Sequence, residues 1–436
     1  MEHLLRNNLV KDCQHGFMPG RSCLTQLLKV LDIWTHILER GGNIDNIYLD
    51  FAKAFDSVPH ERLKIKLEGY EIWGKVLTWI EDFLHDRKQC VVINGTKSPS
   101  IPVTSWVPQG SVLGSLLFVC FINNMPDVVH SSIQMFADDA KLFRDIKNQA
   151  DCEELQKDLC GLQEWSKKWL LRFNVTKCKR MHLGRTNGKE AYHMSQQDEE
   201  TALFETDCEQ DLGVYVDNEL KFSGHCEKNV NQANEILGLI RRSFRYLNGP
   251  FFVTIFKSEV LPHLEYYHPV WSPRYARDCQ LVENVQRRAT RLVSTLRHLN
   301  YPERLERLNL PSLYYRRARG DLIEVYKHLK GHYSVECPYL ELADARPTRD
   351  HSSRLKKPQV QKTVRANFFR VRVVNSSNNL PESVVTAPSV ISFKTRLDQH
   401  WSRFRYIHEP VHAQYLPTVH NRGVTDRPSS YRAYQW

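Results

Sequence analysis

The sequence predicts an α+β fold followed by a largely helical region. Between about residue 47 and residue 143, short runs typical of β-strands alternate with runs at helical spacing. Beyond about residue 220, apolar residues instead recur every three or four positions, as in Val230, Ala233 and Leu237. The chain has 436 residues, 41% of them hydrophobic, and is therefore long enough for two or three domains with cores of their own.

Charge and composition narrow the class of protein. The net charge of +10 is compatible with a polyanionic partner, although many basic proteins bind no nucleic acid. The longest apolar run, Val112–Ile122, is well short of the roughly 20 residues that span a bilayer, and the N-terminus has no signal-peptide core. The 11 cysteines form neither a CxxC pair nor a cluster at zinc spacing. We therefore expect a cytosolic or nuclear protein with no transmembrane segment.

The first elements place an acidic residue at the end of a strand. Residues 47–49 form a short β-like run that ends at Asp50, and Ser57 with Pro59 predicts the start of a helix that extends to about Gly69. The carboxylate of Asp50 is therefore expected at one edge of a sheet.

Two hairpins are predicted next. Apolar residues from Val76 to Leu84 repeat at helical spacing, and Asn94 with Gly95 then forms the turn signal of a tight hairpin. Farther on, alternating residues lead into Asp138 and Asp139 and out again, which predicts a hairpin with both aspartates at its turn.

The later segments complete the α+β part and open the helical region. We expect a helix over residues 152–171, a polar loop over 185–208 and renewed strand character near Leu212. An exposed linker is expected over 346–362, followed by a short helix around 391–401. The outer faces of the later helices are basic, which suits either a solvated surface or phosphate binding. The basic residues are Arg241, Arg242, Arg287, Arg288, Arg291, Arg316, Arg317 and Arg319.

Three aspartates are the candidate metal ligands. Phosphoryl transfer uses two divalent cations about 4 Å apart, held by hard oxygen ligands. Asp138 and Asp139 at a hairpin turn, facing Asp50 at the end of a neighbouring strand, would bring three carboxylates to one rim of a sheet. An adjacent pair of aspartates is by itself far more often an ordinary exposed turn.

Several ordered motifs carry a resemblance to a known family. YLDFAKAFDSVPH, VPQGSVLGSLLF and FADDAKLF occur in the order and spacing of the palm motifs of non-LTR (LINE-type, jockey-like) retrotransposon reverse transcriptases. QHGFMPGRS resembles the preceding fingers segment, WSKKWLLRFNVTKCK the following helix and lysine motif, and DLGV the primer-grip hairpin. The likeness continues through LVENVQRRATRLV to LPESVVTAPSVISFKTRLDQHW and covers almost the whole chain.

The resemblance implies a right-hand polymerase fold. It consists of partial fingers, an antiparallel-sheet palm, a helical thumb and a C-terminal extension. Because members of the family carry further finger strands and usually an endonuclease upstream, we expect a chain that is truncated at its N-terminus. The implied divisions are partial fingers at 1–45, palm at 46–220, thumb and connection at 221–330, and basic linker with C-terminal extension at 331–436.

The resemblance also implies roles for single residues. Asp50, Asp138 and Asp139 would be catalytic and would hold two Mg²⁺ or Mn²⁺ ions, with the Phe51 carbonyl as an additional ligand. Phe55 would stack under the sugar and exclude a 2′ hydroxyl, although a phenylalanine of the core is an equal alternative.

Four further residues would contact the incoming nucleotide. Gln109 and Gly110 would shape its pocket, and the Arg21 guanidinium would clamp the triphosphate, although an arginine is more often a surface residue. Lys177 would approach the leaving pyrophosphate, while Lys168 and Lys179 are nearby alternatives.

One departure from the family pattern bears on activity. Trp106 stands where the family usually has glycine, and a tryptophan lacks the backbone freedom of glycine. The leading hypothesis is an RNA-directed DNA polymerase that uses an RNA template, a DNA primer and deoxynucleoside triphosphates. The alternatives are an inactive retroelement remnant that at most binds nucleic acid, and an RNA-templated RNA polymerase, which Phe55 disfavours.

Overall fold

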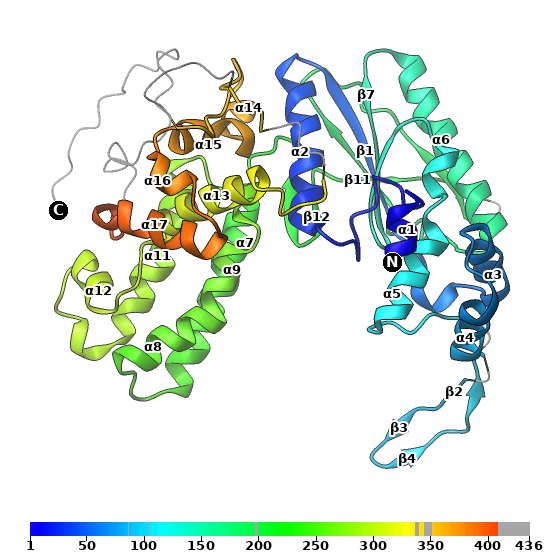
Figure 1. Ribbon diagram of the computed structural model, residues 1–436, viewed down its shortest axis with the longest axis horizontal. Helices are drawn as coiled ribbons and strands as arrows, with labels where there is room; N and C mark the ends of the chain where they lie inside the picture. Colours follow the sequence, from blue (N-terminus) through cyan, green and yellow to red (C-terminus); the bar gives the residue numbers. More distant parts are fainter. Residues whose placement is uncertain (86, 104, 197–198, 336–339, 344–350, 409–436) are drawn as a thin grey trace.

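The computed structural model describes residues 1–408 apart from 86, 104, 197–198, 336–339 and 344–350. A five-stranded sheet with flanking helices forms one half of the molecule, and helices alone form most of the other (Figure 1). The α+β prediction and the helical region after residue 220 are both confirmed. In the part of the chain that is described, no helix is both long and apolar enough to cross a membrane.

The central sheet has the strand order β11-β8-β1-β7-β6. β1 pairs antiparallel with both β7 and β8, β6 pairs antiparallel with β7, and β11 runs parallel to β8. The strands of this sheet are β1 Asn43–Leu49, β6 Ser132–Phe136, β7 Asp139–Ile146, β8 Lys179–Leu183 and β11 Phe204–Glu205.

Side chains from alternate positions of the sheet enter two different cores, as expected for strands of period two. Ile44 and Phe143 face the helix α2, where the Trp34 ring meets the Phe143 ring edge-on at 5.7 Å. Ile47 and Leu142 lie in the core on the opposite face. The helices of this half are α1 Glu2–Arg6, α2 Cys23–Glu39, α3 His60–Gly69, α4 Gly74–Leu84, α5 Val112–Ile122 and α6 Gln149–Trp169, with 3₁₀ turns at Phe55–Ser57 and Met125–Val128.

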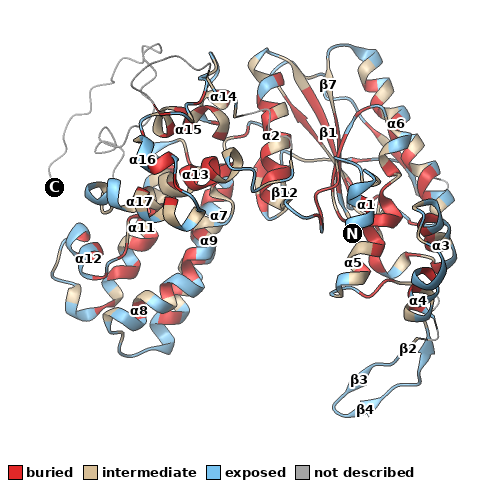
Figure 2. Ribbon diagram, in the orientation of Figure 1, coloured by how far each residue is buried: buried red, intermediate tan, exposed pale blue. Residues whose placement is uncertain are grey.

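A thin, exposed hairpin extends from the lower edge of this half (Figures 1 and 2). Its tip is the predicted turn at Asn94 and Gly95, since Ile93 pairs with Thr96 across it. The short strands are β2 Lys88–Gln89, β3 Val92–Ile93, β4 Thr96–Lys97 and β5 Ile101–Pro102.

The polar stretch predicted as a loop contains strands, so that expectation was wrong. β9 His193–Gln196 pairs with β10 Glu199–Ala202, and β11 follows directly. Next, β12 Cys208–Asp211 and β13 Val214–Asp217 form a hairpin whose turn is Leu212–Gly213.

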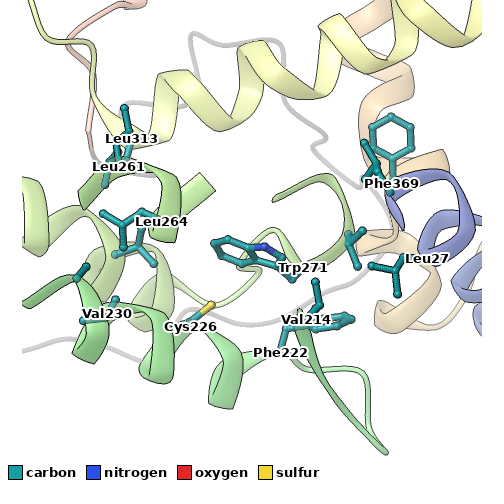
Figure 3. Packing of buried hydrophobic residues seen from close by; sticks show 14 of the residues in the cluster. Leu27, Val214, Phe222, Cys226, Val230, Leu261, Leu264, Trp271, Leu313 and Phe369 are labelled. Carbon is teal, nitrogen blue, oxygen red and sulfur yellow. The ribbon is translucent and has the colours of Figure 1, made fainter. Parts of the chain in front are cut away.

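The helical half packs around Trp271. Figure 3 shows its indole surrounded by Val214, Phe222, Cys226 and Leu264, and this core continues to α2. A separate core joins α13 to the C-terminal helices. The predicted linker at 346–362 begins outside the described residues. The helices are α7 Ser223–Ser243, α8 Gly249–Ile255, α9 Leu261–Glu265, α10 His268–Trp271, α11 Ala276–Ala289, α12 Tyr301–Arg307, α13 Leu313–Leu329, α14 Thr363–Asn367, α15 Phe369–Asn378, α16 Glu382–Val385 and α17 Val390–His400, with a π-helical turn at Phe256–Val260 and 3₁₀ turns at Thr290–Leu292, Ser294–Leu296 and Ser402–Phe404.

Candidate active site

The three candidate metal ligands lie at one end of β1 and β7. Phe136 pairs with Asp139, so Ala137 and Asp138 form the two-residue turn between β6 and β7. Leu49 pairs with Ala140, and continuing this register sets Asp50 opposite Asp139. The predicted hairpin is confirmed, with Asp138 in its turn and Asp139 at the first position of β7 rather than in the turn. All three carboxylates therefore lie at the same sheet rim.

Burial raises the pKa of all three carboxyl groups, and neighbouring aspartate charges add to the effect at Asp138 and Asp139. Burial, followed by the charges of Asp138 and Asp211, raises the pKa of Asp139 to about 6. Burial and the Asp50 charge raise the pKa of Asp138, and burial raises the pKa of Asp50. Three carboxylates that each resist ionisation are stabilised by a nearby cation.

The donor set fits a divalent metal, although the side chains have not converged on one point. The buried Oδ1 of Asp50 accepts no hydrogen bond, which leaves a hard oxygen available as a ligand. Within the described residues, however, no three His, Cys, Asp or Glu side chains are close enough to hold a metal ion. Metal binding therefore requires side-chain movement at this rim.

The segment 172–178 holds the strand end that carries Asp50. The Asn174 amide donates to the Asp50 carbonyl at 2.8 Å, and the Phe51 ring stacks on Phe173 at 4.6 Å between centroids. Lys177 belongs to the same segment, and its Nζ lies 4.0 Å from Asp50 Oδ1. Its side chain is 67% exposed and free to move toward a ligand.

Lys177 is better placed than its two alternatives. Lys179 forms an ion pair with Glu209 at 2.8 Å, and the Lys168 ammonium lies over the Trp169 ring at 5.8 Å. Of the three lysines, Lys177 is the one that faces Asp50.

Phe55 is part of the core in this conformation. It is 8% exposed, stacks on Phe118 with ring centroids 4.3 Å apart, and meets the Phe17 ring edge-on at 6.5 Å. Gln109 and Gly110 form an exposed turn before α5, where Gly110 has a φ of +85°. Glycine suits this turn because its backbone adopts positive φ without strain.

Arg21 is engaged inside the protein rather than directed into an open site. Its side chain is 13% exposed. Nη1 donates to the carbonyls of Asp12 at 3.0 Å and Gln14 at 2.7 Å, and Nη2 donates to the Asp12 carboxylate at 2.9 Å. The sequence motif predicted that Arg21 contacts the triphosphate, whereas in this conformation its guanidinium binds the loop that contains Asp12 and Gln14.

Trp106 occupies a backbone conformation that favours glycine. Its φ is +143°, which is strained for a residue with a side chain. Two hydrogen bonds of the Trp106 main chain hold this backbone conformation. The Trp106 amide donates to the Val58 carbonyl at 3.0 Å, and the Trp106 carbonyl accepts from His60 Nε2 at 2.9 Å. The Arg87 guanidinium covers the ring at 5.1 Å.

Two ion pairs that sequence reasoning missed join the β12–β13 hairpin to the central sheet. Lys141 and Asp211 form a buried pair, with side chains 2% and 5% exposed. Lys179 and Glu209 form a second pair, and the half-buried Tyr48 lies between the two lysines in register. Lys141 is two residues from Asp139 and therefore shares its sheet face. No local sequence pattern could predict the Lys141–Asp211 pair, because the two residues are 70 positions apart.

Comparison with known proteins identifies the family. The model of the reverse transcriptase (RNA-dependent DNA polymerase) family matches residues 1–247. The chain is 29% identical over 252 residues to the RNA-directed DNA polymerase from mobile element jockey of Drosophila melanogaster, covering 53% of this chain and 27% of that protein. It is 25% identical over 294 residues to the probable RNA-directed DNA polymerase from transposon X-element of the same species, covering 64% and 32%.

The chain thus spans about a third or less of the length of these relatives. Among solved structures, the Candida albicans telomerase in complex with a TWJ fragment of telomeric RNA aligns with a TM-score of 0.39 and 11% identity, over 69% of this chain and 56% of that one. Since the family model matches more than half of the sequence, the chain belongs to the reverse transcriptase family, with relatives among the non-LTR transposon polymerases.

Proposed function

We propose that this chain is the polymerase core of a non-LTR retrotransposon reverse transcriptase, which extends a DNA primer on an RNA template with deoxynucleoside triphosphates. The observation that carries the proposal is the position of Asp50, Asp138 and Asp139 at one sheet rim, where burial raises the pKa of each carboxyl. The cytosol or the nucleus is the proposed location.

Asp50, Asp138 and Asp139 would hold two Mg²⁺ or Mn²⁺ ions, with the Phe51 carbonyl as a further oxygen ligand. When bound, the ions supply charge stabilisation to the phosphates and lower the pKa of the primer 3′ hydroxyl. Lys177, exposed beside Asp50, would donate a hydrogen bond or a proton to the leaving pyrophosphate.

Other residues would hold the nucleotide and the nucleic acid. The Phe55 ring would face the sugar and disfavour a 2′ hydroxyl, and the turn at Gln109 and Gly110 would border the base. In the domain divisions expected from the sequence, the palm at 46–220 and the basic thumb at 221–330 would bind template and primer mainly through phosphates. Binding should therefore weaken steeply with salt.

A second candidate function rests on Trp106. Strain at φ +143° beside the proposed nucleotide turn favours an inactive remnant that at most binds nucleic acid. The two candidates differ in whether the protein incorporates nucleotides.

Primer extension tests both. The assay uses a DNA primer on an RNA template with Mg²⁺ or Mn²⁺, and compares wild type, Asp139→Ala and Trp106→Gly. Asp82→Ala is the matched control, because Asp82 is an exposed aspartate of α4. Extension by wild type and Asp82→Ala but not by Asp139→Ala supports the polymerase.

The other outcomes are equally informative. Extension only by Trp106→Gly identifies the strained tryptophan as the lesion. Silence in all variants favours the remnant, and equal extension by wild type and Asp139→Ala contradicts the assignment of the carboxylates.

A further inference from the structure

The segment 13–16 forms an extra edge of the central sheet, directly beside the catalytic turn. Gln14 bridges Met135 of β6 in parallel fashion. The His15 amide donates to the Met135 carbonyl at 2.8 Å, and the Met135 amide donates to the Cys13 carbonyl at 2.9 Å. The motif that resembled a fingers segment is therefore built into the sheet that carries Asp138.

The Gln14 side chain connects this edge to the turn. Gln14 is fully buried, and its Oε1 accepts hydrogen bonds from the Ala137 amide at 3.0 Å and the Gly16 amide at 2.8 Å. Ala137 precedes Asp138 and has a φ of +52°, a conformation that a residue with a side chain adopts only when its surroundings hold it there. We propose that Gln14 is a positioning residue that fixes the turn carrying Asp138 and Asp139.

Gly16 permits the close contact that this arrangement needs. A Cβ on Gly16 would lie 2.3 Å from the Ala137 nitrogen and 2.8 Å from the Phe136 carbonyl carbon. Both are backbone atoms and cannot swing aside, so a side chain at this position would displace the turn. The requirement for glycine here is one of space, because its φ is not in the left-handed region.

Arg21 fixes the loop from which Gln14 extends. Its Nη1 donates to the Gln14 carbonyl at 2.7 Å and to the Asp12 carbonyl at 3.0 Å, while its Nη2 donates to the Asp12 carboxylate. A chain of contacts therefore runs from Arg21 through Gln14 to Ala137 and on to the carboxylates. Arg21 would act through the turn rather than on the triphosphate.

This inference rests on the proposed polymerase function only for its kinetic consequence. A displacement of about 1 Å at a catalytic group commonly lowers rates by about 10²-fold. Loss of the Gln14 acceptor should therefore lower kcat by about 10- to 100-fold and leave the KM for primer–template unchanged, because the fully buried Gln14 side chain cannot contact nucleic acid itself.

The test replaces the acceptor and keeps the shape. Gln14→Met has similar length and no acceptor, whereas Gln14→Glu keeps an oxygen at the same place. Gln26→Met is the matched control, because Gln26 is also fully buried and neither of its side-chain polar atoms has a hydrogen-bond partner. Urea unfolding, amide hydrogen exchange of the peptide 133–140, and kcat with KM in primer extension are measured for each protein.

In Gln14→Met, we expect faster exchange in peptide 133–140 and a 10- to 100-fold lower kcat. Gln14→Glu should restore both, and Gln26→Met should leave both unchanged. If Gln14→Met does not fold, Arg21→Gln, which loosens the same loop from outside, should show the same two effects to a smaller degree.

The proposal would be overturned if amide exchange of peptide 133–140 is unchanged in Gln14→Met, whatever the activity of that variant. If Gln14→Met does not fold, the same result in Arg21→Gln would overturn it. Faster exchange with an inactive wild type would support the positioning of the turn while contradicting the polymerase function, so the two failures are distinguishable.

Discussion

The buried ion pair between Lys141 and Asp211 gives the sharpest test of how the β12–β13 hairpin is attached. The two side chains are 2% and 5% exposed, so neither charge is solvated by water. Removing one partner leaves the other charge buried and uncompensated, which costs about 3–5 kcal/mol. Lys141→Met should therefore lower the free energy of unfolding by about that amount.

Replacing both partners should have a much smaller effect. In the double variant Lys141→Met with Asp211→Leu, neither charge of the pair is left buried without its partner, and such replacements are often neutral or stabilising by about 1–4 kcal/mol. The outer pair, Lys179 with Glu209, is an internal control on the same two elements. Its side chains are 34% and 20% exposed, and its contribution should be about 0.2–1 kcal/mol.

Urea unfolding followed by circular dichroism gives both double-mutant cycles. We expect a coupling energy well above 1 kcal/mol for the inner pair and below it for the outer pair. A cost under about 1 kcal/mol for Lys141→Met alone would refute the reasoning, because it would mean that water solvates the Asp211 charge or that another group compensates it.

Three further predictions follow from the site and its surroundings. Phe55→Val should raise ribonucleotide incorporation at least about 10-fold relative to deoxynucleotides in primer extension, whereas unchanged discrimination would mean that Phe55 serves only the core. Lys177→Met should lower kcat about 10²-fold, with exposed Lys168→Met as the control, and equal rates would remove Lys177 from the mechanism. Burial lowers the pKa of His225 from 6.5 to about 4, so the unfolded chain binds the additional proton and stability falls as pH drops from about 6.5 towards 4. His225 should account for about 2 kcal/mol of the decrease in the free energy of unfolding between pH 7 and pH 5. Urea unfolding of His225→Gln should therefore show a decrease that is smaller by this amount, and the same decrease in variant and wild type would contradict the prediction.

The parts of the fold that the sequence could predict are those set by local pattern. Alternation around Asp138 predicted a hairpin, and Asn94 with Gly95 predicted the other, because turn chemistry acts over two or three residues. The strands β9 and β10 were missed because they are short and mostly polar, and only pairing with each other makes them strands.

In the candidate site, too, the sequence could predict only what local pattern determines. The aspartates were predictable because the motif places them at strand ends. The contacts of Arg21 were not, since an arginine takes whichever acceptors the tertiary fold brings near it. Nor could the sequence indicate that Gln14 meets Ala137, because the two residues are 123 positions apart and no periodicity links them.

The conformation of Trp106 has a genetic consequence. Tryptophan is specified by one codon, TGG, which differs at a single base from the glycine codon GGG. The backbone at this position still has a φ suited to glycine, and its hydrogen bonds to Val58 and His60 use main-chain atoms that every residue provides. A point mutation is therefore enough to exchange the two residues without rebuilding the turn. If Trp106 inactivates the polymerase, selection for polymerase activity in a mutagenised population should recover changes at this codon first.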